Sequence, residues 1–271
     1  MVGALDDIRV LDLSEPLGHY AGYLLANLGA DVVKLEPPHG DDSRSWAPFL
    51  PDLEEPESSL QFMLLNVGKR GMTLDIYSET GRKVFLQLLN EFDVLLQSWT
   101  PQQMESLGLD QDTVRGLFPN LINASVTGWG LDGPYASFAY SDIVSLAMAG
   151  VMNLSGFEEG PPTQLPDQQG FHCASINLAA GVVAAILERD ASGIAQDVEV
   201  SMHESLLMAE ETAMQSADIR GIDRERTGGA RGVIAIKLPG MGLYATQDGW
   251  IYAMAAGIAG SGFNGLLALM D

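Results

Sequence analysis

Short β-rich apolar runs alternate with helical patterns along the first half of the chain, and this alternation limits the folds that the chain can adopt. Apolar residues at helical spacing over 20–28 and 78–90 separate successive runs. Further helices are predicted over 101–107, 112–118, 141–151 and 175–187. Strand–helix–strand units of this kind build parallel sheets with right-handed crossovers. The sequence therefore predicts an α/β fold with a doubly wound parallel sheet. The predicted strands are 8–13, 31–36, 72–76, 93–96 and 121–126.

The composition changes along the chain and predicts two domains of unequal size. Residues 37–59 are rich in Pro, Asp, Glu and Ser, which predicts a long surface loop, and loops of this length are often functional. We predict a large domain over 1–216, a polar linker over 217–240 and the beginning of a smaller α+β domain over 241–271. In the last segment two β-rich runs flank Asp248-Gly249, a pattern typical of a β-hairpin.

The chain is strongly acidic, since 36 Asp and Glu against 14 Lys and Arg give a formal net charge of −22. Such a field repels polyanions and disfavours nucleic-acid binding. The single cysteine, Cys173, excludes an intrachain disulfide and a Cys-cluster metal site, and the four histidines lack the spacing of metal ligands. The longest apolar stretch, 178–187, has about half the length of a membrane-spanning helix. We therefore expect a soluble, cytoplasmic protein with no metal and with no nucleic-acid or membrane partner.

A glycine-rich loop, 127–135, follows the strand predicted at 121–126 and contains Gly128-Trp129-Gly130. Ligands bind at the carboxyl ends of the strands in open α/β sheets, so this loop is a candidate binding loop, although a simple turn explains it equally well. Arg44 and the adjacent pair Lys69-Arg70 are among the few cations of this acidic chain. They either bind phosphate groups or form salt bridges with neighbouring carboxylates.

Five sequence blocks, in order, make the chain similar to the family III CoA-transferases, which include formyl-CoA transferase, carnitine CoA-transferase and α-methylacyl-CoA racemase. One such block is weak evidence, whereas five in the same order are specific. The blocks are 8–14 with 25–38, 66–75, 124–130 with 133–135, 197–201 with Glu204, and 244–253.

The resemblance implies that the chain binds coenzyme A as part of an acyl-CoA substrate, together with a small carboxylic acid. It also implies a Rossmann-like large domain with a small domain, and two interlocked chains, as a homodimer or as a heterodimer with a paralogue. Family members are longer than 271 residues, so we expect this chain to stop within the small domain. By position, the resemblance places Arg44 and Lys69 or Arg70 at the phosphates, Leu17, Gly18 and His19 near the thioester and adenosine, Trp99 in a CoA-binding triplet, and Gly128, Trp129 and Gly130 along the pantetheine path.

The predicted catalytic position departs from the family pattern. Transferases of the family use an Asp before a small-residue helix, and covalent catalysis of this kind needs a carboxylate. Aligned through 178–181, the chain has Asn177 at that place. Either Asp167 or Asp142 supplies the missing carboxylate, or the chain is a non-catalytic CoA-binding subunit that works with an active partner. Racemase chemistry is the less favoured reading, because Tyr140-Ser141-Asp142 lacks the histidine that racemases use.

Overall fold

The computed structural model describes residues 3–50, 56–226, 241–254, 262, 264–265 and 268. Its internal contacts divide the chain into two compact units. The first unit combines Met1–Asp142 with Gln168–Ser205, and the second combines Ile143–Asp167 with Leu206–Asp271. The predicted domain boundary after residue 216 stays a prediction.

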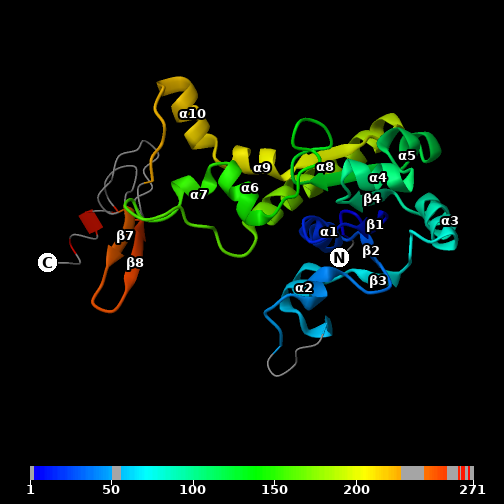
Figure 1. Cartoon of the computed structure of the whole chain (residues 1–271), viewed down its shortest axis with the longest axis horizontal. Coiled ribbons are helices and arrows are strands. Elements are labelled where there is room, and N and C mark those ends of the chain that lie inside the picture. The colour runs from blue at the N-terminus through cyan, green and yellow to red at the C-terminus, as the bar shows by residue number, and fades with distance from the viewer. Residues whose placement is uncertain are drawn as a thin grey trace. The chain divides into compact units, whose positions relative to one another are not determined.

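The first unit contains a six-stranded sheet in the order β3-β2-β1-β4-β5-β6, and every neighbouring pair is parallel (Figure 1). This order confirms the predicted doubly wound, Rossmann-like sheet. It reverses between β1 and β4, and open α/β sheets bind their ligands in the crevice at such a reversal. The strands are β1 (Arg9–Leu13), β2 (Asp31–Glu36), β3 (Arg70–Thr73), β4 (Val94–Gln97), β5 (Ile122–Thr127) and β6 (Val198–Ser201).

Strand β3 begins two residues before the predicted start at residue 72 and ends at Thr73 rather than at residue 76. It is an edge strand, and three of its four residues are exposed. An apolar run is therefore a poor guide to the ends of β3, because the strand is defined by its hydrogen bonds to β2 and most of its residues are exposed.

Helices cover both faces of the sheet, and most of them follow the predicted spans. A short helix, α2, was not predicted, and α8 extends beyond the predicted 175–187 at both ends. The helices are α1 (His19–Asn27), α2 (Leu60–Leu65), α3 (Glu79–Leu88), α4 (Pro101–Leu107), α5 (Gln111–Leu117), α8 (Gln169–Ser192) and α9 (Met202–Ala209), with 3-10 turns η1 (Asp42–Ser45), η2 (Pro56–Ser58) and η3 (Leu89–Glu91).

Among the described residues, α8 is the one helix long and apolar enough to span a membrane. A core helix passes the same test, and α8 packs against α1, β5 and β6. Its Ala174, Leu178, Val182 and Ile186 are buried at helical spacing. The helix therefore serves as a core element of this unit.

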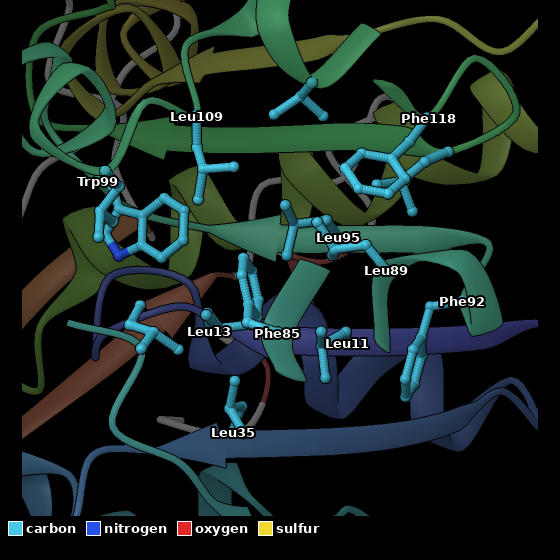
Figure 2. Packing of buried hydrophobic residues seen from close by; sticks show 14 of the residues in the cluster. Leu11, Leu13, Leu35, Phe85, Leu89, Phe92, Leu95, Trp99, Leu109 and Phe118 are labelled. Atoms are coloured by element: carbon cyan, nitrogen blue, oxygen red, sulfur yellow. The ribbon is translucent and has the colours of Figure 1, made fainter. Parts of the chain in front are cut away.

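The main apolar core of the first unit lies between the sheet and α3, α4 and α5. Alternate strand residues, among them Leu11, Leu35 and Leu95, point to this side (Figure 2). Phe85 of α3 is completely buried, and its ring meets the Trp99 ring edge-on at 6.3 Å between centroids. Because Trp99 follows β4 directly, this core also supports the carboxyl edge of the sheet.

The second unit contains α6 (Asp142–Met148), α7 (Val151–Leu154), α10 (Glu211–Arg220) and an antiparallel hairpin. The helix predicted over 141–151 is divided into α6 and α7 by Gly150, which has a φ of 84° that favours glycine. The hairpin joins β7 (Met241–Ala245) to β8 (Trp250–Met254) through the predicted Asp248-Gly249 turn. Of the predicted linker, 217–220 end α10, and 227–240 lie outside the described residues.

Truncation of the buried ring in α3 tests this packing. Phe85→Ala should lower the free energy of unfolding by about 3–5 kcal/mol, because it removes apolar contacts and leaves a cavity. The exposed Leu117 of α5 provides the control, since Leu117→Ala should cost less than about 0.5 kcal/mol. Urea unfolding followed by circular dichroism measures both, and equal losses would contradict this core.

Candidate functional site

A cavity of about 790 Å³ opens at the carboxyl ends of the strands, and all of its lining residues belong to the first unit. The loops that follow β1 and β4 border it, so it lies at the reversal of strand order. Its volume lies within the usual range for small-molecule sites. The lining residues are 13–17, 34–37, 39–42, 46, 74–77, 99–100, 102, 137–141 and 171.

A buried ion pair holds the loop after β1 in place. The Lys69 Nζ atom donates to Asp12 Oδ2 at 2.7 Å, to the His19 carbonyl at 2.9 Å and to Asn66 Oδ1 at 2.8 Å. Burial alone raises the pKa of a carboxyl, but Lys69 and the neighbouring cations hold the pKa of Asp12 below its usual range. A Cβ on Gly22 would come within 2.4 Å of Asp12 Oδ2, so glycine is needed there for the pair to fit.

A second polar cluster joins β2 to the loop that follows it. The Nε2 atom of His19 lies 3.0 Å from Asp41 Oδ2 and 2.9 Å from Lys34 Nζ, and Lys34 also donates to the Ser14 carbonyl. Burial and the charge of Lys34 lower the pKa of His19 to about 4, so the ring is neutral at pH 7. Its Nδ1 atom has no hydrogen-bond partner among the described residues. Of this cluster, Ser14, Lys34 and Asp41 line the cavity.

The three cations predicted at the phosphates all bind carboxylates. Arg44 donates through Nε and Nη2 to both oxygens of Glu36, at 2.7 and 2.9 Å. Arg70 forms an exposed two-point pair with Asp31, and Lys69 is held by Asp12 as described above. All three therefore form the salt bridges of the second alternative, and their predicted phosphate contacts stay predictions. The described cavity lining includes none of the three and, of the predicted binding residues, contains only Leu17 and Trp99.

The predicted binding loop Gly128-Trp129-Gly130 does not line the cavity but packs against Tyr140, which does. A Cβ on Gly128 would meet the Tyr140 side chain at 2.5 Å, so this glycine allows Tyr140 to approach the loop. The Gly128 carbonyl accepts from the His203 backbone N–H at 3.2 Å, and the Trp129 ring lies 5.4 Å from the His203 ring. The loop thus reaches the cavity through Tyr140.

Helix α8 presents Phe171 to the cavity, and Asn177 lies six residues further along the helix. At 1.5 Å per residue, this separation is about 9 Å along the helix axis. Asp142 is buried, and its Oδ1 atom accepts from the Gly170 backbone N–H at 2.8 Å, so it holds the start of α8. Asp167 is exposed, has a φ of 62° and belongs to the second unit. The predicted catalytic roles of these residues stay predictions.

Several titratable residues of the cavity were not predicted, and two of them, Glu15 and Tyr140, have raised pKa values. Partial burial, Asp41 and Asp42 raise the pKa of Glu15, while its side chain stays open to the cavity. Burial and then the charge of Glu15 raise the pKa of Tyr140, so its phenol keeps its proton at neutral pH and can donate to an oxygen anion. The sequence could have indicated Glu15 by its position, since it lies two residues after the first strand, at the carboxyl edge of the sheet.

Comparisons with known proteins agree on one family. The model of CoA-transferase family III matches residues 5–270. The chain belongs to CoA-transferase family III. The formyl-CoA:oxalate CoA-transferase of Streptomyces coelicolor is 40% identical over 205 residues, which are 75% of this chain and 49% of that protein. Subunit BbsE of the succinyl-CoA:(R)-benzylsuccinate CoA-transferase of Thauera aromatica is 33% identical over 91% of this chain and 58% of its own length.

Solved structures of the same fold agree with this membership. A CAIB/BAIF family protein from Brucella suis superposes with a TM-score of 0.84 at 28% identity, over 92% of this chain and 65% of that one. Rv3272 from Mycobacterium tuberculosis superposes with a TM-score of 0.82 at 30% identity, over 100% of this chain and 69% of that one. The chain spans about half the length of the transferases that it matches. The predicted family is confirmed, and no cluster of metal-binding side chains occurs among the residues described for this family member.

Removal of one partner of the buried pair tests its importance in this family III chain. Lys69→Met should cost about 3–5 kcal/mol of unfolding free energy at pH 7, because it leaves the Asp12 carboxylate buried and unpaired. Arg70→Met is the matched control and should cost about 0–1 kcal/mol, since its pair with Asp31 is exposed. Urea unfolding measures both at pH 7 and again at pH 5.

The pH comparison separates charge from packing. In the wild type, the lowered pKa of Asp12 gives stability that persists until the pH falls through the folded-state pKa. In Lys69→Met the unpaired Asp12 should already take up a proton near pH 5, so the penalty should shrink there. A penalty that is equal at both pH values would show that lost packing, and not an unpaired charge, causes it.

His19 gives the chain a second pH dependence. Its folded-state pKa of about 4 lies below the ordinary value of 6.5, so the unfolded chain binds a proton that the folded chain rejects between these values. Stability should therefore be fully present above pH 6.5 and fall as the pH drops toward 4. His19→Gln should flatten this part of the curve of unfolding free energy against pH, and an unchanged slope would contradict the assignment.

Proposed function

We propose that this chain forms part of an acyl-CoA:carboxylate CoA-transferase, which moves CoA between an acyl-CoA thioester and a carboxylic acid. The observation that carries the proposal is the cavity at the reversal of strand order in a chain of this family. Its walls combine aromatic rings with a phenol that keeps its proton, Tyr140. Such a phenol suits the tetrahedral oxygen anion that forms when a thioester is attacked.

The ion pairs limit how CoA phosphates can use the predicted cations. A phosphate that binds Lys69 or Arg44 must displace a carboxylate from a buried or half-buried pair, which leaves Asp12 or Glu36 without its partner. A phosphate at Arg70 displaces only the exposed Asp31, at little cost. Of the three, Arg70 is therefore the cation that a phosphate can bind at least cost, at the start of the edge strand β3 and outside the cavity, and we propose it as the phosphate ligand. We assign Lys69 and Arg44 to support of the loops.

A non-catalytic CoA-binding subunit is the second candidate function. The observation that favours it is that Asn177, a neutral amide, stands where the resemblance places the nucleophilic Asp, while α8 presents the aromatic Phe171 to the cavity. A relative named as a subunit, BbsE, is in keeping with such an arrangement. We propose that the protein works in the cytoplasm as a dimer, with itself or with a paralogue, on an acyl-CoA and a small carboxylic acid. Racemase activity stays the less favoured proposal.

A transfer assay distinguishes the two candidates. The full-length protein is incubated with labelled acyl-CoA and a panel of carboxylic acids, and exchange of the label between thioester and acid is measured. We expect transfer by the lone protein. Transfer that begins only with Asn177→Asp, or with an added paralogue, would support the non-catalytic subunit and contradict the transferase proposal for this chain.

Calorimetric titration with CoA tests the binding residues independently of turnover. Arg70→Ala should weaken CoA binding by roughly 5- to 10-fold and leave unfolding free energy within about 1 kcal/mol of the wild type. Binding that is unchanged in Arg70→Ala would remove this residue from the site.

A further inference from the structure

The backbone around Glu15 is fixed on both sides, whereas its side chain is open to the cavity. The Glu15 backbone N–H donates to Ser98 Oγ at 2.8 Å, which joins the loop after β1 to the residues after β4. Ser14 donates through its N–H to Asp12 Oδ1 at 2.9 Å and accepts from Lys34 through its carbonyl. Glu15 therefore stands at the reversal of strand order, on a loop that both neighbouring strands hold.

The other acidic residues that line the cavity either form hydrogen bonds or ion pairs, or lie on another loop than Glu15. Glu36 binds Arg44, Asp41 binds Lys34 and His19, and Asp75 accepts from the Tyr77 backbone N–H. Among the described lining residues, the carboxylates of Glu15 and Asp42 have neither a hydrogen bond nor an ion pair. Asp42 lies in η1, on the loop after β2, whereas Glu15 lies in the crevice itself.

The surroundings of Glu15 favour a reactive carboxylate. Partial burial and the charges of Asp41 and Asp42 raise its pKa, and a more basic carboxylate is a stronger nucleophile once ionised. The nearby Tyr140 feels the charge of Glu15 and keeps its proton. Its ring packs against Phe171 at 6.4 Å, so the phenol and Glu15 border the part of the cavity that the start of α8 closes.

We propose that Glu15 is the carboxylate nucleophile of this chain, an inference that rests on the proposed CoA-transferase function. A Glu15 oxygen attacks the thioester carbonyl, the C–S bond breaks, and CoA leaves as a thiolate from a mixed anhydride. The thiolate then attacks the Glu15 carbonyl of the anhydride, the donor acid leaves as a carboxylate, and a glutamyl-CoA thioester remains. The acceptor carboxylate reverses these two steps, which releases the new acyl-CoA and regenerates Glu15 with no net gain of protons or electrons.

Trapping of the intermediate tests the proposal directly. The full-length protein is incubated with acyl-CoA without acceptor, treated with borohydride or hydroxylamine, digested and analysed by peptide mass spectrometry. We expect the reduced or hydroxamate adduct on Glu15. Glu15→Gln, which has nearly the same shape, should lose the adduct and at least roughly 1000-fold in turnover while it keeps CoA binding by calorimetry.

Glu91→Gln is the matched control, since Glu91 is exposed and pairs with Arg9 at the start of β1, at the opposite edge of the sheet. It should keep the adduct and turnover within about 2-fold. An adduct on Asp42, Asp142 or Asp167, or turnover by Glu15→Gln equal to that of the wild type, would overturn the role of Glu15 and leave the transferase function standing. A wild-type protein that binds CoA but gives neither adduct nor transfer would instead overturn the transferase function and, with it, the role of Glu15.

Discussion

The buried pair between Asp12 and Lys69 determines the shape of the site, because it joins three parts of the chain: the end of β1, the start of α1 and the segment after α2. Lys69 follows α2, and it holds the carbonyl of His19 at the start of α1 while it pairs with Asp12. The loop between β1 and α1 is thus fixed at both ends, and this loop forms one wall of the cavity. A buried pair of this kind contributes little net stability, since desolvation offsets much of the attraction. Its importance is that neither charge can be removed without loss of the loop geometry.

Four of the few cations of this acidic chain lie buried or half-buried inside the fold. Lys34, Arg44 and Lys69 bind carboxylates around the cavity, and Arg189 of α8 binds Asp93 before β4. The excess of carboxylates gives each of these four cations a partner, and Glu15 and Asp42 of the described cavity lining have none. The field around the cavity therefore disfavours anions, and under the proposed function it limits the places where CoA phosphates can bind. Exposed pairs such as Arg70 with Asp31 are the ones that a phosphate can rearrange at low cost.

The sequence predicts the sheet well, because the pattern of apolar residues reflects burial and most strands of this sheet are buried. The edge strand β3 shows the limit, since its ends depend on hydrogen bonds to β2 and not on burial. The periodicity of the sequence cannot predict which residues form ion pairs. Asp12 and Lys69 lie 57 positions apart, and either could have paired with another residue. Register along α8 is equally hard to infer, since small residues recur through the helix and support several alignments. The pattern around Asn177 thus did not predict that Phe171 lines the cavity.

The contact between α8 and the loop after β1 explains how the proposed chemistry fits this fold. Ser175, one turn beyond Phe171, donates through Oγ to the Leu17 carbonyl at 2.8 Å. The loop that carries Glu15 therefore packs directly on the first turns of α8. The family resemblance places a carboxylate just before or within this helix, whereas the structure offers an unpartnered carboxylate on the loop that the helix supports. Because both elements border the same cavity, a nucleophile on either one can face the same thioester, and the fold need not change for the reactive carboxylate to reside on Glu15.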